Sequence, residues 1–335
     1  MSEFMQAVVT TSNEAQPLEV MTIPAPVVSD EDVLVRVKAV AVNPVDGKQR
    51  QAAVANKSSH VLGFDATGEV VAVGAKVTDF KLGDTVFYAG QLGRLGANAE
   101  LQAVNAALVA KAPTTLSHAE AAALPLTFLT AYELLVDKFG LTVAENSAKG
   151  QTILIINGAG GVGSIMIQLA KWMGMTVVAT ASRQETSDWV TKLGADYVVN
   201  HRRDYVADMH SLGFDLVPYI AILHAPEAHF EQAAALVGPF GHIGAIVESV
   251  EPLPVGLIKN KAASLDWEFM FAKANYGVNM ATQGRALALA ATLADQGVLR
   301  TTLTETMTGM TAETILAAQE KVAAGKVNGK LAIEF

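Results

Sequence analysis

The 335-residue sequence contains no cysteine. That absence excludes disulfide bonds, thiol nucleophiles and every zinc site built on thiolate ligands. Positive charge is also scarce, because 24 Lys and Arg against 33 Asp and Glu give a net charge of −9. The one dense basic cluster, residues 201–203, is too short for a face that neutralises nucleic-acid phosphates. We therefore expect no nucleic-acid partner.

Long hydrophobic runs are missing too, although hydrophobic residues make up 51% of the chain. The most apolar stretches, residues 119–126 and 153–156, are far shorter than the ~20 residues of a membrane span. The first residues lack the basic and then apolar pattern of a secretory signal. We expect a cytoplasmic protein with a large core and no membrane partner, and the length suggests two domains.

Two patterns of secondary structure divide the chain. Short Val-rich runs between glycines predict a β-rich first part, with strands at 7–10, 32–42, 68–73 and 85–88. Ser117 and Glu120 form a capping-box pattern that predicts a helix start, and a helix resumes over 127–138 after Pro125. The later expected strands are 152–157, 176–180, 197–199, 214–220, 242–247 and 263–271. Helices between these strands indicate a parallel sheet with right-handed crossovers. The tail predicts helices over 283–296 and 311–324 and a last strand over 330–335.

A glycine-rich turn is the strongest single motif. It follows the apolar strand at 152–157 and opens a helix over 162–173, and its residues are Gly158, Ala159, Gly160, Gly161, Val162 and Gly163. In that context the glycines permit a tight turn and a close approach to a pyrophosphate. The helix start then offers free N–H groups and the positive end of its dipole. The motif predicts a dinucleotide cofactor.

The choice between NAD and NADP is made near the end of the second strand of such a domain. There, an Asp or Glu would bind the ribose 2′-hydroxyl of NAD, but this sequence has Ser182 and Arg183. A hydroxyl and a guanidinium suit a 2′-phosphate. We therefore expect NADPH. The alternative is that Arg183 is a solvated residue at the helix start and that Glu185 binds NAD.

These motifs resemble a known family. The segments GAGGVGSIMIQLAK and AAALPLTFLTAYELL resemble the medium-chain dehydrogenase/reductase superfamily. Asn43-Pro44-Val45-Asp46 and LGFDATGEVVAVG are similar to its zinc-free branch, the quinone oxidoreductase-like proteins related to zeta-crystallin. The resemblance covers nearly the whole chain, from Ala7 to the last strand.

The resemblance implies an α/β fold with two domains. A GroES-like β-rich catalytic domain would comprise residues 1–127 and 272–335, and a Rossmann domain with a doubly wound parallel sheet would comprise 128–271. Zinc-dependent relatives use a Cys and a His as catalytic ligands, where this chain has Asn43 and Phe64. We therefore expect no metal. His60, Asp65 and Glu69 could replace the ligands only if their side chains converged.

The resemblance also assigns further residues to the cofactor. His201 stands where NADP-using relatives often have a Tyr beside the adenosine or its phosphate. Lys330 falls where relatives place a basic residue near the cofactor phosphates. Thr130 matches a Thr beside the nicotinamide, although it could equally be an ordinary helix residue.

Chemistry without a metal favours some hydride acceptors over others. No Lewis acid would polarise a simple alcohol or carbonyl, so a quinone or an activated enone double bond is the easier acceptor. The oxyanion that develops needs nearby donors. In the segment AVNPVDGKQR we nominate Lys48 and Asn43 as donors and Asp46 as an orienting group, although Asn-Pro could be a simple turn and Lys48 a surface charge. The expected substrate pocket contains Phe64, Tyr88, Leu126 and Asn275.

Two other readings compete with an NADPH-dependent quinone or enone reductase. A short-chain dehydrogenase is disfavoured because no Tyr is followed by Lys four positions later. Some members of the zinc-free branch bind NADPH and act as structural or interaction proteins, and no motif excludes this role. Relatives in the branch also dimerise through the last Rossmann strand, so the apolar segment 265–271 predicts a homodimer.

Overall fold

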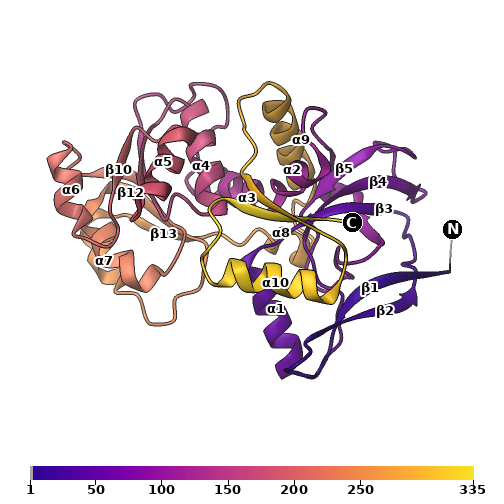
Figure 1. Ribbon diagram of the computed structural model, residues 1–335. Coiled ribbons are helices and arrows are strands. Elements are labelled where there is room, and N and C mark those ends of the chain that lie inside the picture. Colours follow the sequence, from indigo (N-terminus) through magenta and orange to yellow (C-terminus); the bar gives the residue numbers. More distant parts are fainter. Residues whose placement is uncertain (1–2) are drawn as a thin grey trace. The chain divides into compact units, whose positions relative to one another are not determined.

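The structure is a computed structural model, and it describes residues 3–335. The chain divides into two compact units. Unit 1 contains the residues up to Leu129 together with those from Phe271 to the end, and unit 2 is Thr130–Met270. Figure 1 shows the β-rich first unit in indigo and purple and, from Phe271 onward, in orange to yellow, and the second unit in magenta to orange.

Unit 1 is built on a seven-stranded sheet in the order β14-β15-β3-β4-β5-β7, with β6 paired to β3 and a separate hairpin of β1 and β2. Its strands are β1 Phe4–Thr10, β2 Leu18–Pro24, β3 Asp32–Ala41, β4 Asp65–Val73, β5 Thr85–Tyr88, β6 Leu101–Asn105, β7 Val109–Lys111, β14 Leu303–Thr308 and β15 Lys330–Glu334. The ten-residue β3 is the centre of this sheet, and its Val33, Val35 and Val37 are buried in the core. Because β3 pairs with β15 on one side and with β4 on the other, Ala41 lies between Ala332 and Asp65.

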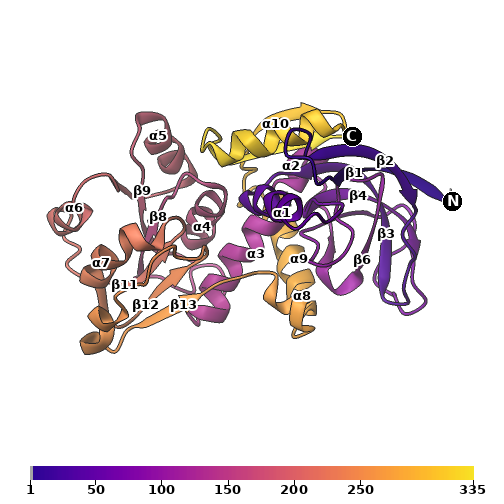
Figure 2. The ribbon, with the colours of Figure 1, turned by 90° about the horizontal axis from the view of Figure 1, so that it is seen from below.

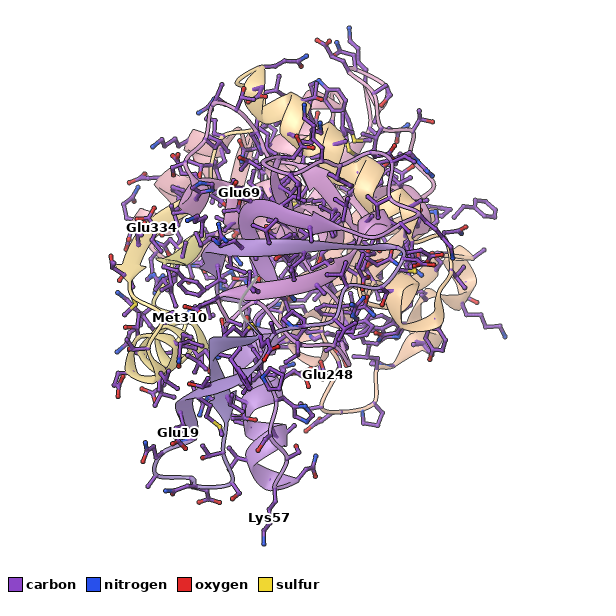
Figure 3. All side chains as sticks on the ribbon, turned by 90° about the vertical axis from the view of Figure 1, so that its right-hand side faces the viewer. Glu19, Lys57, Glu69, Glu248, Met310 and Glu334 are labelled. Carbon is purple, nitrogen blue, oxygen red and sulfur yellow. The ribbon has the colours of Figure 1, made fainter. Side chains whose placement is uncertain are left out.

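Helices cover this sheet. They are α1 Pro44–Ala55, α2 His118–Ala122, α8 Ala272–Tyr276, α9 Ala281–Asp295 and α10 Ala312–Ala323. Helices α1 and α10 lie side by side on one side of the sheet, whereas α9 lies on the other (Figures 1 and 2). The exposed Lys57, just past the end of α1, extends from the tip of this unit (Figure 3).

Helix α1 is absent from the elements expected from the sequence, which left a simple turn at Asn43-Pro44 open as an alternative. Asn43 has the extended backbone of an N-cap, Pro44 is the first helical residue and Asp46 lies in the first turn. Each of these is a favoured helix-start choice. The residues 43–48 therefore lie on a helix start instead of an irregular loop.

Unit 2 is a doubly wound parallel sheet in the order β10-β9-β8-β11-β12-β13, which confirms the fold class expected from the alternating pattern. Its elements are β8 Thr152–Ile156, α4 Gly161–Trp172, β9 Thr176–Thr180, α5 Gln184–Leu193, β10 Tyr197–Val199, α6 Tyr205–Ser211, β11 Val217–Ile222, α7 Pro226–Leu236, β12 Val237–Ala245 and β13 Ser264–Trp267. Helices α4 and α5 lie on one side of the sheet and α7 on the other (Figure 1). Strand order reverses between β8 and β11, which is where such sheets bind ligands.

The expected strand over 263–271 is shorter than predicted. β13 ends at Trp267, and Met270 and Phe271 are buried instead of lying along a free strand. β13 is the edge strand of the sheet, and Trp267 is about half exposed at 45%. The homodimer stays a prediction.

One helical stretch, His118–Lys138, is long and apolar enough to cross a membrane by length and composition. The sequence analysis expected no stretch of that length. In the structure 83% of its most apolar part is buried inside the protein, which is the behaviour of a core helix. The expected interruption at Pro125 is present, because α2 ends at Ala122 and Pro125 begins the separate helix α3 (Pro125–Glu133). The final turn, Leu134–Lys138, is a π-helix.

Candidate active site

A buried ammonium group is the centre of the polar cluster in unit 1. Lys330, at the start of β15, is only 3% exposed, and its Nζ donates three hydrogen bonds. The acceptors are Asn43 Oδ1 at 2.6 Å, Asp65 Oδ2 at 3.0 Å and the main-chain oxygen of Val42 at 3.1 Å. All three protons of the ammonium group are therefore used, as a buried charge requires.

Asp65 balances that charge and connects the cluster to α3. Its Oδ2 accepts from Lys330 and from Asn43 Nδ2 at 2.8 Å, and its Oδ1 accepts from the Leu126 N–H at 2.6 Å. The carboxylate is 0% exposed and has partners on both oxygens. From the sequence, Asp65 was expected only as part of a substitute metal site, and this role was missed, although an acid at the start of a Val-containing strand was a visible signal.

Asp46 holds the main chain at the start of α1. Its Oδ2 accepts from the Asn43 N–H at 2.8 Å. Burial raises the pKa of Asp46 to about 7, although the Asn43 N–H and the charge of Lys330 act in the opposite direction. Asn43 and Asp46 are thus brought together, in keeping with an orienting function for Asp46.

Lys48 lies outside this cluster. It is exposed on α1, two residues after the buried Asp46, and residues two apart on a helix point to different sides. The lysine that joins Asn43 is Lys330 instead. The family resemblance implied a place for Lys330 near the cofactor phosphates, whereas its Nζ donates to Asn43 inside unit 1. The catalytic role of Lys48 and the phosphate role of Lys330 stay predictions.

The four residues expected to line a substrate pocket have different environments. Phe64 is buried against Phe271, with ring centroids 4.8 Å apart. Tyr88 is fully buried in the core, burial raises the pKa of its hydroxyl, and that hydroxyl has no partner among residues 3–335. Leu126 contributes its N–H to Asp65, and Asn275 is exposed on α8.

The glycine turn of unit 2 has the geometry of a phosphate cradle. A Cβ on Gly163 would lie 2.5 Å from the main-chain oxygen of Gly158, and one on Gly158 would lie 2.9 Å from the Cβ of Ala179. Both positions therefore require glycine for the turn to close against β9. Helix α4 begins after Gly160 without any side-chain cap, so its first N–H groups, including those of Gly161 and Val162, remain available for an anion. A dinucleotide pyrophosphate fits this turn.

A chain of hydrogen bonds links the turn to His201. The N–H of Asn157 donates to Thr180 Oγ1 at 2.9 Å, and Thr180 Oγ1 lies 3.0 Å from His201 Nδ1. Thr180 is fully buried, so its hydroxyl proton needs an acceptor, and Nδ1 supplies one. Nε2 then carries the ring proton of His201. Burial, with Arg202 and His224 nearby, lowers the pKa of His201, which fits a neutral ring.

Ser182 and Arg183 lie shortly after the end of β9 at Thr180, and Arg183 is the N-cap of α5. Its main chain is fixed by Thr186, which accepts from the Arg183 N–H at 3.2 Å and donates to the Arg183 oxygen at 2.9 Å. The Arg183 side chain is exposed, as is Glu185 in the first turn of α5. Both candidates for the 2′-position of the ribose therefore lie at the carboxyl edge of the sheet. Thr130 is buried on α3.

The donor set does not fit zinc. Within residues 3–335, no three His, Asp or Glu side chains converge as metal ligands, and His60 is exposed while Asp65 is buried. The Lys330 ammonium already neutralises the Asp65 carboxylate and occupies the amide oxygen of Asn43. A second cation beside that group would be repelled.

The chain was compared with known proteins. Residues 29–114 match the alcohol dehydrogenase GroES-like domain and residues 161–261 match the zinc-binding dehydrogenase family. It is 41% identical over 311 residues to a zinc-type alcohol dehydrogenase-like protein of Staphylococcus aureus (strain MSSA476), covering 92% of each chain. It is 40% identical over 197 residues to the chloroplastic NADPH-dependent alkenal/one oxidoreductase of Arabidopsis thaliana, covering 56% of this chain and 49% of that protein.

Solved structures agree on the fold. A putative zinc-dependent alcohol dehydrogenase of Rhizobium etli CFN 42 superposes with a TM-score of 0.93 at 38% identity, covering 100% of this chain and 99% of that one. An alcohol dehydrogenase superfamily protein of Novosphingobium aromaticivorans has a TM-score of 0.85 at 31% identity, covering 99% of both chains. The protein is therefore a member of the medium-chain dehydrogenase/reductase family of oxidoreductases, which use a nicotinamide cofactor on a small-molecule substrate.

Proposed function

We propose that this protein is an NADPH-dependent reductase that transfers a hydride to a quinone or to an activated enone-type double bond without zinc. The observation that carries the proposal is the Lys330–Asn43–Asp65 cluster. Asn43 stands where zinc-dependent relatives have a cysteine ligand, and here it is bonded to the protein's own cation. The Arabidopsis thaliana protein that matches part of this chain is named an NADPH-dependent alkenal/one oxidoreductase, and this name supports the same chemistry.

NADPH would supply the hydride, and unit 2 provides the groups to hold it. The turn from Gly158 to Gly163 would bind the pyrophosphate through main-chain N–H groups and the start of α4. Arg183 and Ser182 would bind the 2′-phosphate, with the neutral His201 ring beside the adenosine. The Asn157–Thr180–His201 chain would keep the turn and that ring in fixed relation.

Unit 1 would orient and stabilise the acceptor by electrostatics. Both polar atoms of the Asn43 amide are bonded inside the cluster, so we assign Asn43 a positioning role. Lys330 is likewise engaged and buried. In the segment 43–48 the exposed cation is Lys48, and we keep it as the candidate donor to a developing oxyanion. The final proton can come from water.

The test is a steady-state assay of NADPH oxidation with a panel of quinones, enones, saturated ketones and simple aldehydes. We expect turnover of quinones or enones, little turnover of the saturated compounds, and unchanged rates in the presence of a chelator. Lys48→Met should lower kcat, whereas Lys57→Met, at the also exposed lysine just past the end of α1, should not. Activity that needs stoichiometric zinc, or that is confined to simple alcohols and aldehydes, would contradict the proposal.

A second candidate function is supported by the same cluster. Because the Asn43 amide and the Asp46 carboxylate are directed into the protein, the segment has few groups for substrate. The protein would then bind NADPH and act as a structural or interaction protein. Tight NADPH binding with no turnover across the whole panel would favour this function over the reductase.

A further inference from the structure

Two buried carboxyl groups meet in unit 2, and the function described so far does not use them. Glu133 is the last residue of α3, and Glu268 directly follows β13. They are 3% and 4% exposed, and their side chains share a hydrogen bond. The other oxygen of Glu268, Oε1, has no hydrogen-bond partner among residues 3–335. Such a pair is costly to bury, so its presence calls for a reason.

The fold brings the two acids together through three local features. The Glu268 N–H donates to the Ala245 oxygen at 2.9 Å, which fixes Glu268 at the carboxyl ends of β12 and β13. Gly244 of β12 has no side chain, and a Cβ there would collide with Leu134, so the turn that follows α3 packs closely on β12. The turn that follows Glu133 is a π-helix, a rare element that occurs often at functional sites.

The pair holds one proton and one negative charge. Two carboxylates in contact cannot both be ionised without a large cost, whereas a protonated one donates to an ionised one. Burial and then the charge of Glu133 raise the pKa of Glu268 to about 9. Lys138, in the π-helical turn, acts in the opposite direction, and Asp137 acts in the same direction as Glu133. Both of those side chains are exposed, so water screens them.

The sheet order locates the pair relative to a bound dinucleotide. In this strand order a dinucleotide lies across the carboxyl ends of the strands, with its pyrophosphate at the turn after the first strand, here β8. Ser182 and His201 follow β9 and β10, on one side of that turn, and would take the adenosine half. The other half then extends over β11, β12 and β13, where Glu268 lies. Thr130 is one helical turn before Glu133 on α3.

We propose that the Glu133–Glu268 pair is a buried single negative charge that favours the oxidised, positively charged nicotinamide ring over the reduced, neutral ring. This inference rests on the proposed use of NADPH. A nicotinamide ring that has given up a hydride with its two electrons would carry a positive charge, and the pair would stabilise that charge through a medium of low dielectric constant. The pair itself neither gains nor loses a proton in the step. The pair acts on the ring only through its electric field and does not touch the reacting atoms.

The experiment compares the dissociation constants of NADP⁺ and NADPH by tryptophan fluorescence at pH 7. Glu268→Gln keeps the shape and the hydrogen bond and leaves the charge on Glu133, so the ratio Kd(NADP⁺)/Kd(NADPH) should change by less than about twofold. In Glu133→Gln/Glu268→Gln the charge is gone, and the ratio should rise on the order of tenfold. An unchanged ratio in the folded double variant would overturn the proposal.

A pH titration of the same ratio provides a test that does not need the double variant. Between pH 7 and 10 the wild-type pair loses its one remaining proton and becomes doubly negative, so the ratio Kd(NADP⁺)/Kd(NADPH) should fall. In Glu268→Gln this ratio should stay level. Another titratable pair on β12 and β13, His242 and Asp266, has its side chains 3.1 Å apart and is common to both proteins. If the ratio depends on pH in the same way in wild type and in Glu268→Gln, the inference about the acid pair is wrong, and the proposed function is unaffected. Failure of the wild type to bind NADPH at any pH would instead refute the proposed function.

Discussion

Lys330 Nζ lies 2.6 Å from Asn43 Oδ1, although 287 positions separate the two residues in the sequence. The central strand β3 makes this contact possible, because it pairs with β15 on one side and β4 on the other. The contact places a lysine of the last strand at the start of α1. It also means that the first and last parts of the chain must both be present for the cluster to form.

Removal of the buried ammonium group should therefore destabilise the protein strongly. Lys330→Met leaves the Asp65 carboxylate buried without its cation, and breaking a buried pair in this way costs about 3–5 kcal/mol. Urea unfolding measures the loss. The exposed Lys48→Met should change stability by less than about 0.5 kcal/mol, and Lys330→Met/Asp65→Asn should recover part of the loss. A Lys330→Met protein as stable as wild type would show that the cluster contributes little.

Asp46 should make stability depend on pH between about 4 and 7. Burial raises its folded-state pKa from 3.8 to about 7, so the folded protein favours the protonated acid. Its stabilising contribution is then fully present below pH 4 and is lost as pH rises to 7, by roughly 4 kcal/mol. Asp46→Asn keeps an oxygen for the Asn43 N–H and removes the titration. Wild-type stability relative to this variant should fall from pH 4 to 7 and then level; a constant difference would contradict the shifted pKa.

How far the sequence predicts each feature depends on the range of the interactions that form it. The turn at Gly158–Gly163 was predictable because strand, turn and helix are adjacent in the chain. The Lys330–Asp65 pair depends on strand register between distant segments, so no local sequence pattern could predict it. Helix α1 was missed for another reason: Asn43 followed by Pro44 is compatible with a turn as well as with a helix start, and no local pattern decides between the two.

The later strands and the Glu133–Glu268 pair also show that local sequence patterns do not predict features formed by long-range contacts. β9 and β10 were predicted with their correct ends because each is a Val-rich run between breakers. β12 begins five residues earlier than expected, at Val237, because its pairing with β11 overrides the glycines and Pro239 in its first half. Glu133 and Glu268 come together only through helix-to-sheet packing, and no local pattern marks them as neighbours.

Gly163→Ala should prevent the glycine turn from closing. The added Cβ would lie 2.5 Å from the Gly158 oxygen, which is backbone and cannot move aside without opening the turn. Overpacking of this kind costs about 1–3 kcal/mol, and NADPH binding should be lost with the cradle. Gly47→Ala in α1 is the matched control, since its Cβ would meet nothing within 4 Å, and it should stabilise by about 0.5–1 kcal/mol. Thermal melts with and without NADPH distinguish the two, and normal NADPH binding by Gly163→Ala would rule out the cradle.

Arg183→Ala should remove most of the preference for NADPH over NADH. The exposed guanidinium follows β9 at the carboxyl edge of the sheet, where it can pair with a 2′-phosphate that NADH lacks. A charge-assisted hydrogen bond contributes ~1.5–3 kcal/mol, so NADPH affinity should fall on the order of tenfold to a hundredfold. Exposure to salt and water should bring the loss toward the lower end. NADH affinity should barely change, because no contact to its 2′-hydroxyl is removed.

Calorimetric titrations of both cofactors on wild type, Arg183→Ala and Glu185→Ala decide the assignment. Glu185, two residues further on and also exposed, is the residue that would bind the 2′-hydroxyl if the protein used NADH. We expect Glu185→Ala to leave the NADPH preference in place, because removal of a carboxylate near the phosphate relieves repulsion. A wild type that prefers NADH and loses that preference in Glu185→Ala would transfer the specificity role from Arg183 to Glu185. Equal loss of both cofactors in Arg183→Ala would show that the guanidinium contacts a part common to the two dinucleotides.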